Sequence, residues 1–239
     1  MLAAALAFTL LASSPASPSG EIPVGPTLVI APHPDDETLG CGGMIATRAA
    51  EGRRVVVVVV TDGRALFRRF GVTDPSELDV SAMRKAETLR AVEILGANPR
   101  DVRFLDFENE RLAEQRAEAG RRLEAILAEL SPSEVYVTSP FEGHREHVLA
   151  NELTRAACAA TGKCPSLLEY VVTLGRGQTL DTVPRRVVRM NVSAVRDRER
   201  RALAQFRSHL DLIYKGQPAP LTPNYDRYLT DEEPFLVDK

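Results

Sequence analysis

The chain has 239 residues, 44% of them hydrophobic, and a formal net charge of −3 at pH 7. A chain of this length can bury one substantial core, so we expect a single domain. The slightly acidic balance gives no electrostatic reason to expect a partner such as a nucleic acid or another polyanion. Trp is absent and only four histidines are present, so the position of each histidine is informative.

The first twenty residues form an uncharged segment in which an apolar run, Leu2–Ala12, precedes a stretch rich in Ser and Pro. An apolar run of this length is typical of a signal peptide and is too short to span a bilayer as a helix, although the basic start of a signal peptide is missing. We therefore predict a signal peptide over residues 1–20, one domain over 21–239, no stable transmembrane span, and export to the periplasm or the extracellular space. A chain that keeps the segment would be cytoplasmic.

Strand and helix patterns alternate along the rest of the chain. Six consecutive valines, 55–60, indicate a central strand covered on both faces. We expect an irregular loop at 64–76 and coil after residue 216. The alternation predicts an α/β, Rossmann-like three-layer fold with a mostly parallel sheet and catalytic loops at the carboxyl ends of its strands. Strands are expected at 27–30, 54–60, 102–105, 135–138, 167–174 and 186–192, and helices at 38–50, 77–95, 112–130, 145–160 and 194–209.

A histidine and three carboxylates directly follow the first expected strand, as His33, Asp35, Asp36 and Glu37. In open α/β sheets, ligands bind outside the carboxyl ends of the strands. The following glycines, in Gly40-Cys41-Gly42-Gly43, lack the spacing of a dinucleotide-binding turn. A His/carboxylate cluster at this place is typical of a metal site, so the segment is interpreted as half of one.

The second half is expected after the fourth strand, where His144 and His147 lie three positions apart and so share one face of a helix. His33, Asp36 and His147 together offer two imidazoles and one carboxylate. Three protein ligands with a position left open for water are the composition of a catalytic zinc site. We therefore expect one Zn²⁺ per chain, with other divalent metals as alternatives.

The remaining polar groups match the other steps of metal-assisted hydrolysis. Asp35 is the candidate acceptor of a proton from the attacking water, and His144 is the candidate to stabilise the oxyanion or to protonate the departing amine. Glu37 and Glu146 are expected to contact the metal ligands and orient them without binding the metal. His209, at the end of an arginine-rich helix, is assigned a surface role.

The three cysteines fall into two groups: Cys41 lies next to the expected metal motif, and Cys158 and Cys164 lie close together in the sequence. Cys41 is interpreted as a small buried residue at a tight helix start and not as a further metal ligand. A disulfide between Cys158 and Cys164 is an open alternative that depends on export.

At these motifs the chain resembles the PIG-L/LmbE-like zinc N-deacetylases, over most of residues 27–210. The resemblance implies zinc on His33, Asp36 and His147, a general base at Asp35, and His144 as transition-state stabiliser. It is carried by four features: the His33-Pro34-Asp35-Asp36-Glu37 motif, Thr61-Asp62-Gly63, the Arg84-x-x-Glu87 helix and the His144-x-x-His147 pair.

The chain departs from the family pattern around the expected pocket. Arg145-Glu146 separates the distal histidines where Pro-Asp is usual, Glu142 replaces a tyrosine of the mycothiol-type enzymes, and Glu108-Asn109-Glu110 replaces a Pro-Asp-Gly turn. Asn109 can still hydrogen-bond a substrate hydroxyl. These changes leave the hydrolytic groups intact and put the substrate in question.

Several arginines have two interpretations. The resemblance implies that Arg84 binds substrate, whereas a lone helical arginine is often solvated or paired, here with Glu87. Arg64, Arg68 and Arg69 either meet an anionic group of the substrate or belong to a solvated loop.

The leading hypothesis is a zinc-dependent hydrolase that removes acetyl from an N-acetylglucosamine-type sugar or glycoconjugate. One alternative is an amidase of another small N-acyl substrate, which needs only a different pocket wall. Another is a non-catalytic sugar-binding or metal-binding homologue. The presence of both Asp35 and His144 favours an enzyme, because binding alone requires neither.

We predict that the mature chain begins near residues 19–21, because the apolar run and its Ser/Pro-rich end precede that point. Mass spectrometry of protein from the native host should find the shortened chain outside the cytoplasm. An intact Met1 in the cytosolic fraction would contradict the export prediction.

Overall fold

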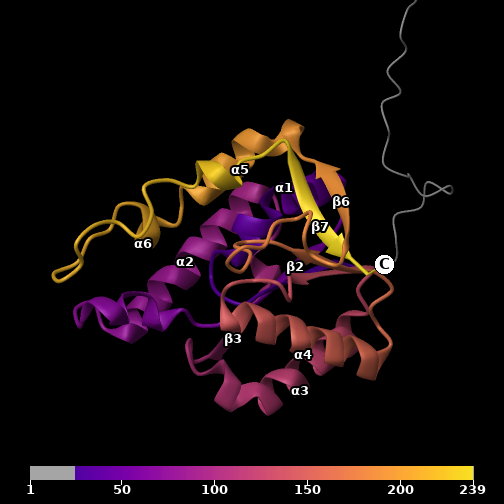
Figure 1. Ribbon diagram of the computed structural model, residues 1–239, viewed down its shortest axis with the longest axis horizontal. Coiled ribbons are helices and arrows are strands. Elements are labelled where there is room, and N and C mark those ends of the chain that lie inside the picture. The colour runs from indigo at the N-terminus through magenta and orange to yellow at the C-terminus, as the bar shows by residue number, and fades with distance from the viewer. Residues whose placement is uncertain (1–24, 239) are drawn as a thin grey trace, which may run out of the picture.

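The computed structural model describes residues 25–238, and the predicted signal peptide lies outside them (Figure 1). Within these residues one mixed sheet has the strand order β3-β2-β1-β4-β5-β7-β6. The first five in that order are parallel, and β7 runs antiparallel to both β5 and β6. The predicted α/β fold with a mostly parallel sheet is confirmed. The strands are β1 Thr27–Ala31, β2 Val55–Thr61, β3 Val102–Phe107, β4 Glu134–Thr138, β5 Leu167–Tyr170, β6 Arg186–Asn191 and β7 Glu232–Val237.

Helices cover both faces of the sheet and make the three layers of the fold (Figure 1). Alternate valines of β2 explain this arrangement: Val55, Val57 and Val59 pack in the core beneath α1, α2 and α5, and the other three pack beneath α3 and α4. A strand buried on both faces needs apolar side chains at every position, as the valine run provides. The helices are α1 Asp36–Ala50, α2 Glu77–Leu95, α3 Arg116–Leu130, α4 Arg145–Thr161, α5 Arg196–Leu203 and α6 Arg207–Leu210.

The order of the strands places the two histidine motifs side by side. The chain proceeds from β1 outward through β2 to β3, and then returns to place β4 on the other side of β1. The connections that leave β1 and β4 therefore diverge and leave a crevice at the carboxyl edge of the sheet. His33 follows β1, and His144 and His147 follow β4, so both motifs face this crevice.

Glycines let the start of α1 lie close against its neighbours. A Cβ atom on Gly40 would lie 2.2 Å from Cδ2 of the buried Tyr170, and one on Gly43 would lie 2.6 Å from Cβ of Val192. Cys41 between them is fully buried in the core, in agreement with its interpretation as a small packing residue.

Two elements differ from the sequence-based expectations in their bounds: the strand expected at 167–174 ends at Tyr170, and the helix expected at 112–130 begins with a 3₁₀ helix, Leu112–Gln115. Three further segments differ in kind. Residues 64–70 of the expected loop form a 3₁₀ helix that is bounded by Gly63 and Gly71, both in the left-handed conformation. The expected helix 194–209 divides into α5 and α6, because the backbone turns at Phe206 to bury its ring completely. The expected C-terminal coil contains β7, whose Phe235 and Leu236 are buried in the sheet. Proline and acidic residues masked the strand pattern there.

The structure pairs Cys158 with Cys164, joining the end of α4 to the segment before β5. Disulfides persist mainly in oxidising compartments, so the pair is consistent with export, which stays a prediction. None of the helices between residues 25 and 238 is long and apolar enough to cross a membrane.

We predict that Gly40→Ala destabilises the fold by about 1–3 kcal/mol, because the added methyl overlaps the Tyr170 ring. Tyr170 cannot easily move, since its hydroxyl donates to the carbonyl of Ile30 at 2.9 Å. The matched control is Gly120→Ala in α3, where the nearest atom is 3.7 Å away and alanine should stabilise by about 0.5–1 kcal/mol. Urea unfolding measures both changes, and a stabilised Gly40→Ala variant would contradict the packing argument.

Candidate metal and catalytic site

A cavity of about 370 Å³ opens at the carboxyl edge of the sheet. Its wall brings together side chains from the ends of β1, β3 and β4, from α2, and from α6. Most of the polar residues that the sequence analysis singled out line this cavity. His209, which was expected at the surface, lines it as well. Together these residues are His33, Asp35, Asp36, Arg69, Arg84, Asn109, His144 and His209.

The turn between β1 and α1 aims neighbouring carboxylates in different directions. Asp36 is the first residue of α1, and its Oδ2 accepts a hydrogen bond from the backbone N–H of His33 at 2.9 Å. Asp35 has φ 124°, a conformation that non-glycine residues adopt at a cost of about 1–3 kcal/mol. Glu37 supports this turn, because its Oε2 accepts the backbone N–H of Asp35 at 3.1 Å.

Three donor atoms converge from the two motifs. His33 Nδ1 lies 3.0 Å from Asp36 Oδ2 and 3.2 Å from His147 Nε2, and His147 Nε2 lies 3.2 Å from Asp36 Oδ2. Ligand atoms about 2.0–2.1 Å from a tetrahedral zinc ion are about 3.3 Å apart, so this triangle has the size of one face of such a site.

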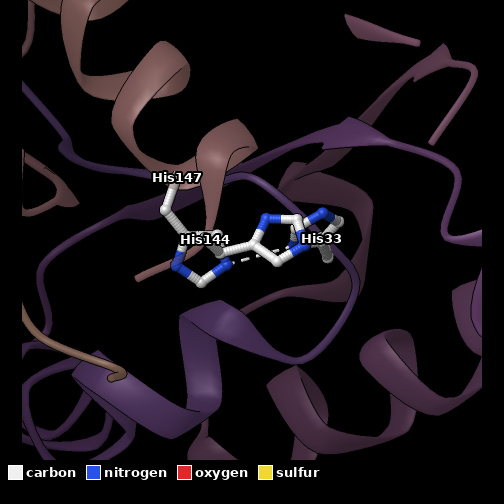
Figure 2. A group of neighbouring side chains, drawn as sticks. All are labelled: His33, His144 and His147. Carbon is white, nitrogen blue, oxygen red and sulfur yellow. Dashed lines mark hydrogen bonds between the residues drawn. The ribbon is translucent and has the colours of Figure 1, made fainter. Parts of the chain in front are cut away.

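His144 offers a second possible set of three ligands. Donor atoms of His33, His144 and His147 lie within 4.8 Å of one another, which makes the three histidines a possible metal site (Figure 2). His33 comes from the turn after β1, and the other two from the start of α4. However, His144 Nδ1 already accepts the backbone N–H of Glu146 at 3.3 Å, as the cap of that helix. The set that contains Asp36 is the more compact one.

Two carboxylates contact the ring nitrogens of His33 and His147 that do not belong to the triangle. Glu146 Oε2 lies 2.9 Å from His33 Nε2, and Glu142 Oε2 lies 3.3 Å from His147 Nδ1. Such contacts fix the ring orientation and tautomer of a metal-binding histidine. Glu146 therefore contacts one of the imidazoles, whereas Glu37 contacts the turn.

Glu142 was missed as a positioning residue. The signal was its place two residues before His144, which we noted only as a departure from the family's tyrosine. In the structure its carboxylate also accepts the backbone N–H groups of Val172 and Thr173, at 2.7 and 2.8 Å. These bonds connect His147 to the segment that follows β5.

Burial and neighbouring charges separate the protonation states of the site residues. Burial alone would raise the pKa of Asp36, but His147 and His33 hold that pKa well below its ordinary value. Burial raises the pKa of Asp35 to about 7, against the opposing charge of Arg84. His144 is exposed at the cavity, and desolvation by the atoms around its ring, with the nearby His33 and His147, lowers its pKa to about 4. Burial alone would lower the pKa of His147, but Asp36 and Glu142 raise it to about 10. Without a metal, the site at neutral pH therefore contains an ionised Asp36, a protonated His147 and a neutral His144.

Arg84 lines the cavity, but its guanidinium is directed at the turn that carries Asp35. Its Nη2 lies 3.1 Å from Asp35 Oδ1 and also donates to the carbonyl of Pro34, and Nη1 donates to the carbonyl of Gly63 at 3.4 Å. A Cβ on Gly63 would lie 2.3 Å from Nη1, which explains the glycine in this turn. The alternative pairing with Glu87 is not seen.

Asn109 and the loop arginines are also placed. The side-chain amide of Asn109 donates to Glu146 Oε2 at 2.8 Å, so Asn109 has a structural partner as well as a place in the cavity wall. Arg64 pairs with Asp62, and Arg68 pairs with carboxylates including Glu77. Only Arg69 among the three loop arginines lines the cavity.

The surface role expected of His209 is wrong. Its side chain is only 17% exposed, it lines the cavity, and its Nε2 lies 3.5 Å from Asp35 Oδ2. The turn at Phe206 and the docking of α6 on α2 carry it there, and no local sequence pattern announces either. All four histidines of the chain therefore gather at one site.

The comparisons with known proteins agree with this geometry. Residues 28–158 match the family model described as GlcNAc-PI de-N-acetylase, PIG-L. A Bacillus cereus protein named "Probable N-acetyl-alpha-D-glucosaminyl L-malate deacetylase 2" is 28% identical over 202 residues, which are 81% of this chain and 88% of the relative.

Solved structures share the fold. The N,N'-diacetylchitobiose deacetylase from Pyrococcus horikoshii has a TM-score of 0.67 at 21% identity, over 89% of this chain and 84% of that one. The 4-carboxy-2-hydroxymuconate hydratase from Pseudomonas putida has a TM-score of 0.61 at 22% identity, over 76% and 78% of the two chains. Because proteins named for different reactions share this fold, the reaction has to be argued from the side chains.

Proposed function

We propose that this chain, which belongs to the PIG-L family of GlcNAc-PI de-N-acetylases, uses one zinc ion to remove acetyl from an N-acetylglucosamine-type sugar or glycoconjugate. The observation that carries the proposal is the triangle of donor atoms on His33, Asp36 and His147, with sides of 3.0, 3.2 and 3.2 Å. Two imidazoles and one carboxylate leave a coordination position open, as catalytic zinc sites do.

The residues fit this metal in composition as well as in spacing. Glu146 contacts His33 Nε2 and Glu142 contacts His147 Nδ1. His33 Nδ1 and His147 Nε2 are therefore the ring nitrogens left to bind metal. When bound, zinc would polarise the acetyl carbonyl and lower the pKa of a coordinated water toward about 7. Other divalent metals remain alternatives in the same ligand set.

Asp35 is proposed as the general base. It lines the cavity next to the Asp36 ligand, and Arg84 and the turn hold its carboxylate in place. Burial raises the pKa of Asp35 to about 7, which suits a group that accepts a proton near neutral pH and later gives it up.

His144 is proposed to stabilise the oxyanion. Its Nδ1 accepts the N–H of Glu146, so in the neutral ring the proton resides on Nε2. The pKa of His144, lowered by desolvation of the ring and by the neighbouring histidines, keeps the ring neutral. A neutral Nε2–H can donate to the developing negative charge of the acetyl oxygen. It is a poor proton source for the leaving amine, so that proton is expected from Asp35.

The substrate is proposed from the cavity wall and the relatives' names. Arg84 and Asn109 both line the cavity and are the candidates to meet sugar hydroxyls, although each also has a structural partner. Arg69 adds a cation at the wall, which favours a conjugate with an anionic group beside the sugar.

We predict that Asp35→Asn keeps about one zinc per chain and loses about 10²–10⁴-fold in kcat, because the amide preserves the shape but cannot accept the proton. His147→Ala should instead lose the metal. The matched control is Asp197→Asn on the exposed face of α5, whose side chain is 94% exposed and which should behave as the wild type. Metal analysis and acetate release from N-acetylglucosamine, N,N'-diacetylchitobiose and N-acetylglucosaminyl malate provide the two readouts.

The outcomes separate the alternatives. Metal loss in Asp35→Asn, with metal and activity retained in Asp36→Asn, would exchange the roles of the two aspartates. Release from other N-acyl compounds, but from none of the sugars, would favour the amidase alternative. A wild-type protein that binds zinc and releases nothing would favour the non-catalytic alternative.

A further inference from the structure

His209 and Arg84 lie next to different oxygens of the proposed base, Asp35. Its Nε2 lies 3.5 Å from Asp35 Oδ2, while Arg84 Nη2 lies 3.1 Å from Oδ1 of the same carboxylate. We propose that His209 is a positioning residue whose Nε2 accepts a hydrogen bond from the proton that Asp35 takes from the attacking water. This inference rests on the proposed hydrolysis and assigns a new residue to it.

The neighbouring residues determine which nitrogen of His209 carries the proton. Ser208 Oγ donates its only hydrogen to Glu87 Oε2 at 2.6 Å, and the backbone N–H of Ser208 donates to Glu87 Oε1 at 2.8 Å. Ser208 Oγ also lies 3.3 Å from His209 Nδ1. Since the hydroxyl hydrogen is already donated, Oγ can only accept from Nδ1–H. The proton of the neutral imidazole is therefore on Nδ1, and Nε2 faces Asp35 with a lone pair.

A lone pair that faces a carboxylate favours the protonated form of that carboxylate over the ionised form. Opposite an ionised Asp35, two acceptors face each other, and the separation of 3.5 Å is longer than a hydrogen bond between oxygen and nitrogen. Once Asp35 is protonated, its O–H can donate to Nε2 of His209. The imidazole therefore stabilises the protonated carboxyl, which exists only after the water has given up its proton.

The charges around His209 agree with a neutral ring. Burial lowers the pKa of His209 well below its ordinary value, and Arg84 adds to this shift. Arg69 also lines this wall of the cavity. Two guanidinium groups nearby disfavour an imidazolium, so His209 acts as an acceptor throughout.

The proton moves from the water to Asp35 and then to the amine, and His209 is never protonated. The O–H bond of the water breaks, its oxygen forms the bond to the acetyl carbon, and the proton forms an O–H bond on Asp35 Oδ2. His209 Nε2 accepts a hydrogen bond from that O–H and holds the carboxyl in one orientation. When the C–N bond breaks, the same proton passes to the amine nitrogen, and Asp35 returns to its ionised form.

The first experiment compares two amide variants in the zinc-loaded protein. His209→Gln places an amide oxygen near the position of Nε2 and should retain most of kcat. His209→Asn is too short to reach Asp35 and should lose about 10–100-fold in kcat, by analogy with the partners that orient metal-binding side chains. KM should change little, because the contact forms only as the proton moves. Metal content and Tm should match the wild type in both variants.

Wild-type kcat in His209→Asn, or equal losses in the two variants, would overturn the proposal. Loss of metal in His209→Asn, with kcat restored by added zinc, would overturn it too, because the role would then lie in metal retention. If the wild type itself releases no acetate, the proposed function fails, and the second experiment still decides the assignment of His209.

The second experiment uses no turnover. Long-range ¹H–¹⁵N correlation spectra of the full chain should show His209 protonated at Nδ1 and bare at Nε2, with its signals identified by their absence from His209→Gln. Ser208→Ala removes the acceptor of Nδ1–H and should shift the ring toward the Nε2–H tautomer. An Nε2–H tautomer of His209 in the unsubstituted protein would contradict the proposal whatever the kinetics show.

Discussion

Oδ2 of Asp36 lies between two imidazoles, 3.0 Å from His33 Nδ1 and 3.2 Å from His147 Nε2. His33 and Asp36 follow β1 and His147 follows β4, so this contact exists only because β1 and β4 are neighbours in the sheet. An ionised carboxylate buried without partners costs several kcal/mol. The strand order, the turn after β1 and the start of α4 therefore depend on one another, and the site is a consequence of the sheet topology.

Helix α2 stabilises the turn that carries the proposed base, although it contributes no proposed metal ligand. Arg84 donates to the carbonyls of Pro34 and Gly63 and contacts Asp35. One turn further along the same helix, Glu87 accepts hydrogen bonds from Ser208, which precedes His209, the histidine next to Asp35 Oδ2. Asp35 itself has a positive φ, a conformation that costs about 1–3 kcal/mol. The Arg-x-x-Glu pattern of α2 thus supports the site from two directions.

The sequence predicted the residues that lie close to a strand end. His33, Asp36 and His147 could be grouped because the carboxyl ends of parallel strands share one edge of a sheet, and the valine run identified β2 because both of its faces are buried. Glu142 and His209 could not be placed in the same way. The position of Glu142 depends on bonds to the segment after β5, and that of His209 on the turn at Phe206 and the docking of α6 on α2. The strand β7 was missed for a related reason, since it is defined by pairing with β5 and β6 and not by its own composition.

A crystal structure of the zinc-loaded protein, with anomalous data collected on both sides of the zinc edge, tests the central claim most directly. The account predicts one anomalous peak in contact with His33 Nδ1, Asp36 Oδ2 and His147 Nε2, with His144 Nδ1 still accepting the N–H of Glu146. A peak held by the three histidines His33, His144 and His147, with Asp36 turned away from it, would contradict both the ligand set and the role proposed for His144.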